Sequence, residues 1–92
     1  MQQREAKTKV GNQDPARQVE STDGHRLFSV IRTADNLFRF IEETEVYEPE
    51  SPAVPAYWYW TETHRSGLYA TVEAAENEAI GTLPWLKIKV AN

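Results

Sequence analysis

Four consecutive aromatic residues, Tyr57-Trp58-Tyr59-Trp60, constrain the fold of this chain more than any other stretch. They include two of the three Trp and two of the four Tyr among 92 residues. Aromatic side chains are enriched in strands, and successive side chains of a strand point to opposite faces of the sheet. We therefore predict a central strand over residues 56–63, against which the rest of the chain packs. Tyr57 and Tyr59 are expected on one face, and Trp58 and Trp60 on the other.

Two more strands are predicted upstream, over residues 26–33 and 37–46. Residues 34–36 (Ala-Asp-Asn) suit the hairpin loop between them. Asp favours a type I turn, and Asn tolerates the left-handed conformation that closes such a loop. The hairpin then pairs Thr33 with Leu37.

The register that follows from this pairing makes both faces of the hairpin apolar. It places Val30 opposite Phe40, and Ile31 opposite Arg39. One face then carries Phe28, Val30, Phe38 and Phe40, and the other carries Leu27, Ile31, Leu37 and Ile41. An antiparallel sheet with one face in water should instead alternate between apolar and polar residues. Both faces of this sheet therefore need cover.

A single helix is predicted after the third strand. Thr71 is a suitable N-cap, because its hydroxyl can accept a hydrogen bond from a first-turn N–H. Apolar residues with helical spacing follow at Val72, Ala75, Ala79 and Leu83. Pro84 is expected to end the helix. A helix of about eleven residues is about 16 Å long and shields only one face of the sheet.

The end of the chain alternates between apolar residues and lysines from Leu86 to Val90, which predicts a short fourth strand over residues 86–90. The complete prediction is an α+β domain. It has a three- or four-stranded antiparallel sheet with one helix packed on one face, in the order β-β-β-α-β.

Composition divides the chain near residue 24. Apart from Met1, residues 1–24 contain only Val10 and Val19 as large apolar residues, so they cannot bury enough surface to offset the entropy of ordering. We predict a disordered N-terminal tail over residues 1–24 and a single small domain over residues 25–92. A chain of 92 residues fits one domain.

Charge and composition exclude several classes of function. Residues 26–83 carry four Arg and ten acidic residues, a net charge of −6, which would repel a phosphate backbone. Nucleic acid is therefore not expected as a partner. Cysteine is absent, so no disulfide or thiolate chemistry is available. The sequence contains no apolar run of membrane-spanning length and no signal-peptide pattern, and we expect a cytoplasmic protein without membrane contact.

No catalytic, metal or cofactor motif is complete. The two histidines, His25 and His64, do not have metal-ligand spacing, and a zinc site needs at least three protein ligands. Ser66 lies close to His64 in the sequence, but a Ser–His pair also needs a third group to orient it. No glycine-rich phosphate loop is present. We therefore predict no enzyme activity, no cofactor and no metal.

A dense acidic run lies at the end of the second predicted strand and in the proline-rich segment 47–55. It consists of Glu42, Glu43, Glu45, Glu48 and Glu50. Such a run is either solvated or presents a negative patch to a basic partner.

Residues 68–83, LYATVEAAENEAIGTL, form the predicted joint between the third strand and the helix. Tyr69 is followed by the small residue Ala70, by Thr71, and by an Ala-rich helix with the apolar Ile80 near its end. This pattern resembles that of the YegP-type domain of unknown function. The resemblance implies a small module of three strands plus a helix, and it implies no functional residue.

One aromatic pair of the quartet is expected under the helix and the other on the open sheet face. Candidate contact residues are the quartet, three aliphatic residues and the third Trp: Tyr57, Trp58, Tyr59, Trp60, Leu27, Ile31, Ile41 and Trp85. Most soluble oligomers are closed and two-fold, so we predict a non-enzymatic protein-interaction module that forms a homodimer, or binds another protein, through this face. The alternative is a binder of a small planar or sugar ligand, or of single-stranded nucleic acid, because aromatic rings stack on bases and sugar rings.

Overall fold

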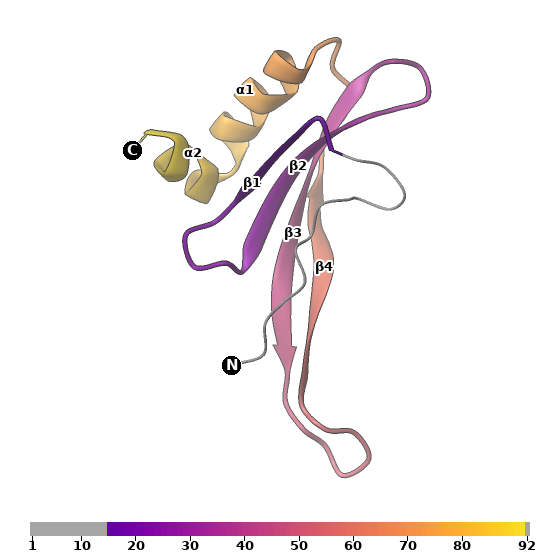
Figure 1. Cartoon of the computed structure of the whole chain (residues 1–92), viewed down its shortest axis with the longest axis vertical. Helices are drawn as coiled ribbons and strands as arrows, with labels where there is room; N and C mark the ends of the chain where they lie inside the picture. Colours follow the sequence, from indigo (N-terminus) through magenta and orange to yellow (C-terminus); the bar gives the residue numbers. More distant parts are fainter. Residues whose placement is uncertain (1–14, 92) are drawn as a thin grey trace.

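The computed structural model describes residues 15–91, and it shows one antiparallel sheet with two helices packed on one face (Figure 1). The strands are β1 (Arg17–Glu20), β2 (Arg26–Arg32), β3 (Phe38–Glu48) and β4 (Tyr57–Arg65), and the helices are α1 (Val72–Thr82) and α2 (Pro84–Ala91). Strands that are neighbours in the sequence are also neighbours in the sheet, in the order β1-β2-β3-β4. The predicted α+β class with an antiparallel sheet is confirmed, but four strands precede both helices, so the predicted order is wrong.

The hairpin between β2 and β3 has the predicted loop and register. Thr33 N donates a hydrogen bond to Leu37 O at 2.7 Å, and Asn36 adopts the left-handed conformation with φ 61°. Val30 pairs with Phe40 as a consequence. A short loop that suits its residues is sufficient to fix the register of both strands.

The first strand, β1, lies within the segment that the sequence predicted to be a disordered tail. Of that segment, residues 1–14 lie outside the described part of the chain, and the prediction is wrong for residues 17–20. One large apolar residue is sufficient to order β1, because Val19 packs on the core and β1 pairs with β2 along its whole length. Arg17 Nε also forms an ion pair with Glu76 Oε2 of α1 at 2.8 Å.

The core lies between the helices and one face of the sheet. Its buried side chains are Phe28, Val30, Phe40, Ala75, Ala79, Leu83 and Leu86. The predicted helix is confirmed in α1, where Thr71 Oγ1 accepts a hydrogen bond from Ala74 N at 3.0 Å. The small buried side chains of α1 let this helix lie close to the sheet. Each large apolar side chain buried in this layer contributes about 1.5–3 kcal/mol to stability.

The predicted fourth strand over residues 86–90 is wrong, because these residues belong to α2. Pro84 starts this helix, and proline is favoured at the first helical position because no backbone N–H is needed there. Leu86 is fully buried, whereas Ile88 is 66% exposed. A strand would have placed both side chains on one face, so the short alternation belongs to a helix that buries only Leu86 deeply.

On the sheet face opposite the helices, the largest aliphatic side chains are buried or half-buried. Leu27 and Ile41 are 4% and 2% exposed, and Ile31 is half-buried. Their cross-strand neighbours include long polar side chains, with Glu43 beside Leu27 and Arg65 beside Ile41. A second copy of the chain is therefore not required to bury this part of the sheet.

The β3–β4 hairpin continues beyond the end of β2. The last pair between β2 and β3 is Arg26↔Thr44, whereas β3 and β4 stay paired as far as Glu48↔Tyr57. Residues 45–60, which we call the arm, form a two-stranded projection away from the body of the domain, along the molecule's longest dimension of 48 Å (Figure 1). The aromatic quartet lies on this arm and on an edge strand, so its predicted central position is wrong.

Candidate interaction site on the β3–β4 arm

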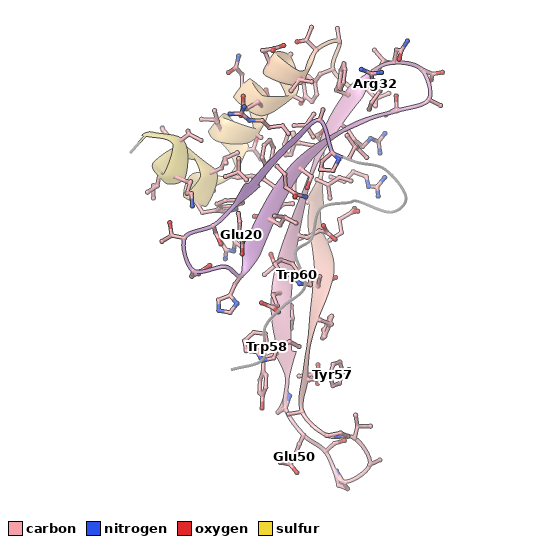
Figure 2. The ribbon with its side chains drawn as sticks, viewed as in Figure 1. Glu20, Arg32, Glu50, Tyr57, Trp58 and Trp60 are labelled. Carbon is pink, nitrogen blue, oxygen red and sulfur yellow. The ribbon has the colours of Figure 1, made fainter. Side chains whose placement is uncertain are left out.

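The arm exposes a cluster of large aromatic side chains. This aromatic cluster consists of four residues that are 39–51% exposed: Tyr47, Tyr57, Trp58 and Tyr59. In Figure 2, Tyr57 and Trp58 extend to opposite sides of the arm, and Glu50 lies in the loop at its end. Large exposed apolar patches on soluble domains mark interaction sites. The arm is therefore the strongest candidate for a functional surface.

Cross-strand register assigns these rings to two faces of the arm. The Tyr face carries Val46, Glu48, Tyr57 and Tyr59, and the Trp face carries Glu45, Tyr47, Trp58 and Trp60. Ring centroids are 5.7 Å apart for Tyr57 and Tyr59, and 5.2 Å apart for Tyr47 and Trp58. The predicted division of the quartet between two faces is confirmed. The prediction that one pair lies under a helix is wrong, because both faces of the arm lie beyond the helices (Figure 1).

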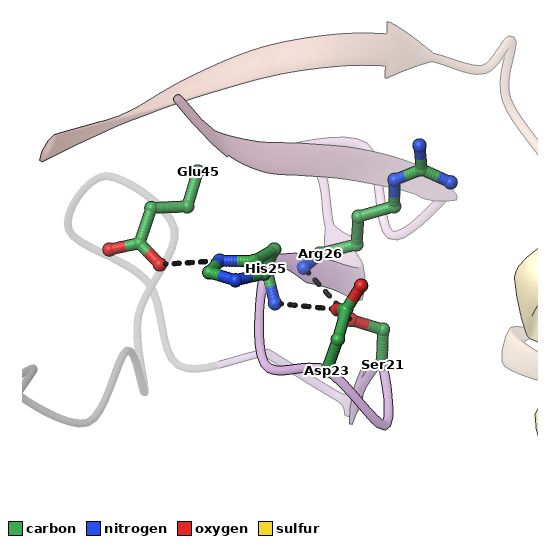
Figure 3. A network of polar contacts seen from close by, with 5 residues as sticks. All are labelled: Ser21, Asp23, His25, Arg26 and Glu45. Atoms are coloured by element: carbon green, nitrogen blue, oxygen red, sulfur yellow. Dashed lines mark hydrogen bonds and ion pairs between the residues drawn. The ribbon is translucent and has the colours of Figure 1, made fainter. Parts of the chain in front are cut away.

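The Trp face is attached to the β1–β2 turn through His25. The imidazole ring of His25 stacks on the indole ring of Trp58, with centroids 5.2 Å apart and ring planes at 8°. His25 Nδ1 lies 3.2 Å from Glu45 Oε1 (Figure 3). The backbone carbonyl of His25 also accepts a hydrogen bond from Glu45 N at 2.7 Å. The base of the arm is thereby fixed to the body of the domain.

The turn that presents His25 is held by its own hydrogen-bond network (Figure 3). Ser21 Oγ donates to Asp23 Oδ1 at 2.7 Å, and the same carboxylate oxygen accepts from His25 N at 2.9 Å. Arg26 N donates to Ser21 Oγ at 3.0 Å. The hydrogen bond from His25 N, followed by that from Ser21, holds the pKa of Asp23 below its usual value. Gly24, with φ 77°, supplies the left-handed residue that this turn requires.

A second set of contacts fixes the base of β4. The β3–β4 register shifts between Glu42 and Glu43, which leaves Thr63 as an extra residue in β4. Thr63 Oγ1 donates to Glu42 Oε1 at 2.7 Å, and Trp85 Nε1 donates to Glu42 Oε2 at 2.7 Å. Trp85, which the sequence predicted as a contact residue, is therefore half-buried and ties α2 to the sheet.

The arm and its base are strongly acidic. Residues 42–62 contain six Glu and no Lys, Arg or His. Some carboxylates are engaged: Arg65 donates to Glu62 from Nε at 2.9 Å and from Nη2 at 2.8 Å, which lowers the pKa of Glu62. The side chains of Glu48 and Glu50 are exposed, and their carboxylates have no hydrogen-bond or ion-pair partner among residues 15–91. The arm therefore combines aromatic rings with exposed carboxylates at Glu48 and Glu50.

β4 lies at one edge of the sheet. β4 is the last strand of the sheet, and within the described range no other strand pairs with this edge. Proteins commonly protect such edges with Pro, Lys or a bulge. Residues 57–62 contain neither Pro nor Lys, and the extra residue Thr63 comes only after them.

The structure separates the predicted contact residues into an exposed group and a buried group. Tyr57, Trp58 and Tyr59 are exposed on the arm, and Trp60 is half-buried at its base. The others are buried or half-buried in the body: Leu27, Ile31, Ile41 and Trp85. The sequence had predicted that these residues share one open apolar face. The structure instead separates the arm from the sheet face opposite the helices.

Two further members of the site were not found by sequence reasoning. It placed Tyr47 in a loop and found no role for His25. Extending the β3–β4 register beyond Thr44 would have placed Tyr47 opposite Trp58. His25 has no comparable signal, because its contact with Trp58 depends on how two hairpins meet.

The described residues do not form a group that could hold a metal ion. Among residues 15–91, no three His, Cys, Asp or Glu side chains are grouped so that they could hold a metal ion. In the same range, no helix has both the length and the apolar character needed to span a membrane. A cavity of about 560 Å³ between the β1–β2 turn and α2 is lined by Ser21, Thr22, Asp23, Trp85, Ile88 and Lys89. Its carboxylate, Asp23, accepts hydrogen bonds from Ser21 Oγ and His25 N and so holds the β1–β2 turn.

Comparisons with protein-family models, with curated proteins and with solved structures found no match to this chain. The resemblance of residues 68–83 to the YegP-type domain therefore stays a prediction. The function has to be inferred from the geometry and chemistry of the arm.

Proposed function

We propose that this chain is a non-enzymatic protein-interaction module that binds its partner through the arm. One observation supports the proposal above all: Tyr47, Tyr57, Trp58 and Tyr59 are exposed together on a two-stranded projection. Tyr and Trp are enriched at protein interfaces and among the residues that contribute most binding energy, because each ring buries a large area in the partner. A projecting arm can place these rings in a groove of another protein.

The shape of the arm favours a protein over a small ligand. Small-molecule sites are concave and bury roughly 70–90% of the ligand surface. The aromatic cluster instead lies on two outward faces of a projection, so a sugar or planar ligand would stay largely in water. Single-stranded nucleic acid is disfavoured because the six Glu of residues 42–62 would repel its phosphates.

Charge also favours a partner other than a second copy of the chain. Two arms in contact would bring Glu45, Glu48 and Glu50 of one copy toward the same residues of the other, and like charges brought together at an interface weaken binding. The homodimer expected from the sequence was needed to cover an apolar sheet face, and that face is already buried at Leu27 and Ile41. The proposal therefore assigns the arm to a different protein.

Site-specific photo-cross-linking in the cells that produce the chain tests the proposal. The photoreactive residue p-benzoylphenylalanine replaces Tyr59 on the arm in one variant, and it replaces Glu73, which is exposed on α1, in the control. We expect a defined adduct from position 59 alone, identified by mass spectrometry. The adduct should disappear when Tyr47 and Tyr57 are replaced by Ser. Equal cross-linking from both positions, or none from position 59, would contradict the proposal, and an adduct of two copies of the chain would replace the different protein with a homodimer.

A further inference from the structure

We infer that the cavity between the β1–β2 turn and α2 binds a small zwitterion with an apolar body, the chemistry shared by apolar amino acids and short apolar peptides. This site is separate from the arm and does not depend on the function proposed for the arm. Three features of the cavity support this ligand class. They are its size, a carboxylate and an ammonium group that share its wall without pairing, and apolar side chains in the same wall.

The cavity has the size of a small-molecule site. Its volume is about 560 Å³, and sites for small molecules typically measure roughly 300–1,000 Å³. Two elements that are far apart in the sequence form it, the turn at residues 21–25 and the helix α2. A ligand seated in the cavity would therefore contact both elements.

Asp23 contributes a fixed carboxylate to the cavity wall. Its Oδ1 accepts hydrogen bonds from Ser21 Oγ at 2.7 Å and from His25 N at 2.9 Å (Figure 3). The bond from His25 N, followed by that from Ser21, lowers the pKa of Asp23, so the carboxyl group is ionised at neutral pH. Both bonds end on Oδ1, and Oδ2 has no hydrogen-bond or ion-pair partner among residues 15–91. Oδ2 is therefore available to accept a hydrogen bond from a ligand ammonium group.

Lys89 contributes the opposite charge to the same wall. Within the described part of the chain, its ammonium group has no hydrogen-bond or ion-pair partner, and it does not pair with Asp23. The cavity is thus lined by one carboxylate and one ammonium group that do not neutralise each other. A ligand with one charge of each sign can pair with both groups at once, whereas a ligand with a single charge leaves one of them unpaired.

Trp85 and Ile88 supply the apolar part of the wall. Trp85 Nε1 donates a hydrogen bond to Glu42 Oε2 at 2.7 Å, so the indole ring is held in place and offers a ligand only its apolar surface. Ile88 is 66% exposed, although its side chain is large and aliphatic. A hydrocarbon or aromatic group packed against these two side chains would remove apolar surface from water, which favours binding.

Much of the wall is fixed before a ligand arrives. Ser21, Asp23 and Trp85 are each held by side-chain hydrogen bonds to other parts of the domain or of the turn. Binding therefore costs little side-chain entropy at these three positions. Only a few ligand atoms can be covered in so small a site, and we expect a dissociation constant on the order of 1 mM.

Two zwitterionic probes, L-phenylalanine and the dipeptide L-leucyl-L-phenylalanine, test this inference. Each is titrated into the full chain while backbone amide and Trp indole NMR signals are recorded. For each probe, the N-acetylated form lacks the ammonium group and the C-amidated form lacks the carboxylate. L-Alanine is a zwitterion without a large apolar group. The variants are Asp23→Asn, which keeps an acceptor oxygen for the turn, Lys89→Gln, and the control Lys87→Gln, which is exposed on α2 but outside the cavity lining.

We expect the probes to shift the signals of the β1–β2 turn and of α2, and the tighter of the two assigns the site to free amino acids or to short peptides. Acetylated and amidated forms, and L-alanine, should bind at least about tenfold more weakly. Lys89→Gln should weaken the zwitterion about tenfold and leave the amidated form unchanged, because that form has no carboxylate to pair. Asp23→Asn should weaken the zwitterion and leave the acetylated form unchanged. Lys87→Gln should change neither.

Several results would overturn the inference. They are no shift of the turn and α2 signals by either probe up to about 20 mM, equal binding of the acetylated or amidated forms, and equal weakening by Lys87→Gln and Lys89→Gln. The NMR spectrum of each variant shows whether it is folded. If Asp23→Asn unfolds the turn, the comparison of Lys89→Gln with Lys87→Gln on the zwitterion and its amidated form decides the outcome.

Discussion

The imidazole ring of His25 lies flat on the indole ring of Trp58, with centroids 5.2 Å apart. This contact joins the turn between β1 and β2 to the arm. The same histidine also contacts Glu45 through both its ring and its backbone carbonyl. The arm is consequently anchored at its base, while the rest of the projection exposes its rings.

Replacing His25 by Ala should loosen the arm and reduce the free energy of unfolding by about 1 kcal/mol, because one aromatic stack is lost. Amide hydrogen exchange in residues 45–48 and 57–60 should become faster. His64→Ala is the matched control, since His64 stacks on Phe40 in the body with centroids 5.3 Å apart. It should lower stability without speeding exchange in the arm. Unchanged exchange in the arm of the His25 variant would argue against the anchor.

The aromatic residues of the arm should matter little for stability. Tyr57→Ser should change the free energy of unfolding by about 0.5 kcal/mol or less, because Tyr57 is exposed beyond the core. Phe40→Ala should cost about 3–5 kcal/mol, because it leaves a cavity under the helices. Denaturant unfolding measures both values. If Tyr57→Ser lowered the free energy of unfolding as much as Phe40→Ala, Tyr57 would have to be part of the core, contrary to the structure.

Two substitutions in α2 distinguish the helix from the predicted strand. Leu86→Ala should cost about 2–5 kcal/mol, because Leu86 is fully buried. Ile88→Ala should change stability by no more than about 0.5 kcal/mol, because Ile88 is mostly exposed. Thermal or denaturant unfolding gives the comparison. Equal losses for the two residues would indicate that they share one face, as in a strand.

The β1–β2 turn should weaken in acid. The pKa of Asp23 is lowered in the folded chain, so the ionised carboxylate stabilises the fold above the ordinary value of 3.8. This contribution is lost as the pH falls through the folded-state pKa. An NMR titration of the Asp23 carboxyl group should give a pKa below 3.8, and Ser21→Ala should bring it closer to 3.8 without reaching it, because His25 N still donates. A native value at or above 3.8 would contradict the network.

The sequence predicted the features that depend on neighbouring residues. The β2–β3 register followed from the loop that pairs Thr33 with Leu37, and α1 followed from the Thr71 cap and its apolar stripe. β1 was missed because Val19 is its only large apolar residue, and backbone pairing leaves no mark on side-chain periodicity. Asp23-Gly24 ahead of an apolar run was the available signal for that hairpin, because Asp-Gly is typical of tight turns.

The position of the arm was harder to predict, because it depends on distant parts of the chain. The alternation that assigned Tyr57 and Trp58 to opposite faces is local, and it was correct. Whether these faces are covered depends on where β2 begins, and β2 begins only at Arg26 because residues 21–25 form the turn that leads from β1. The short alternation after Pro84 fits a helix or a strand equally well, and packing of Leu86 decides between them.

The central claim is that the arm is the partner-binding element. Its most direct test compares the photo-cross-linking yield from position 59 on the arm with that from position 73 on α1 in the same cells. We predict a single defined adduct from position 59, lost in the Tyr47→Ser, Tyr57→Ser variant while that variant stays folded. Equal yields from the two positions, or no adduct from position 59, would contradict the claim.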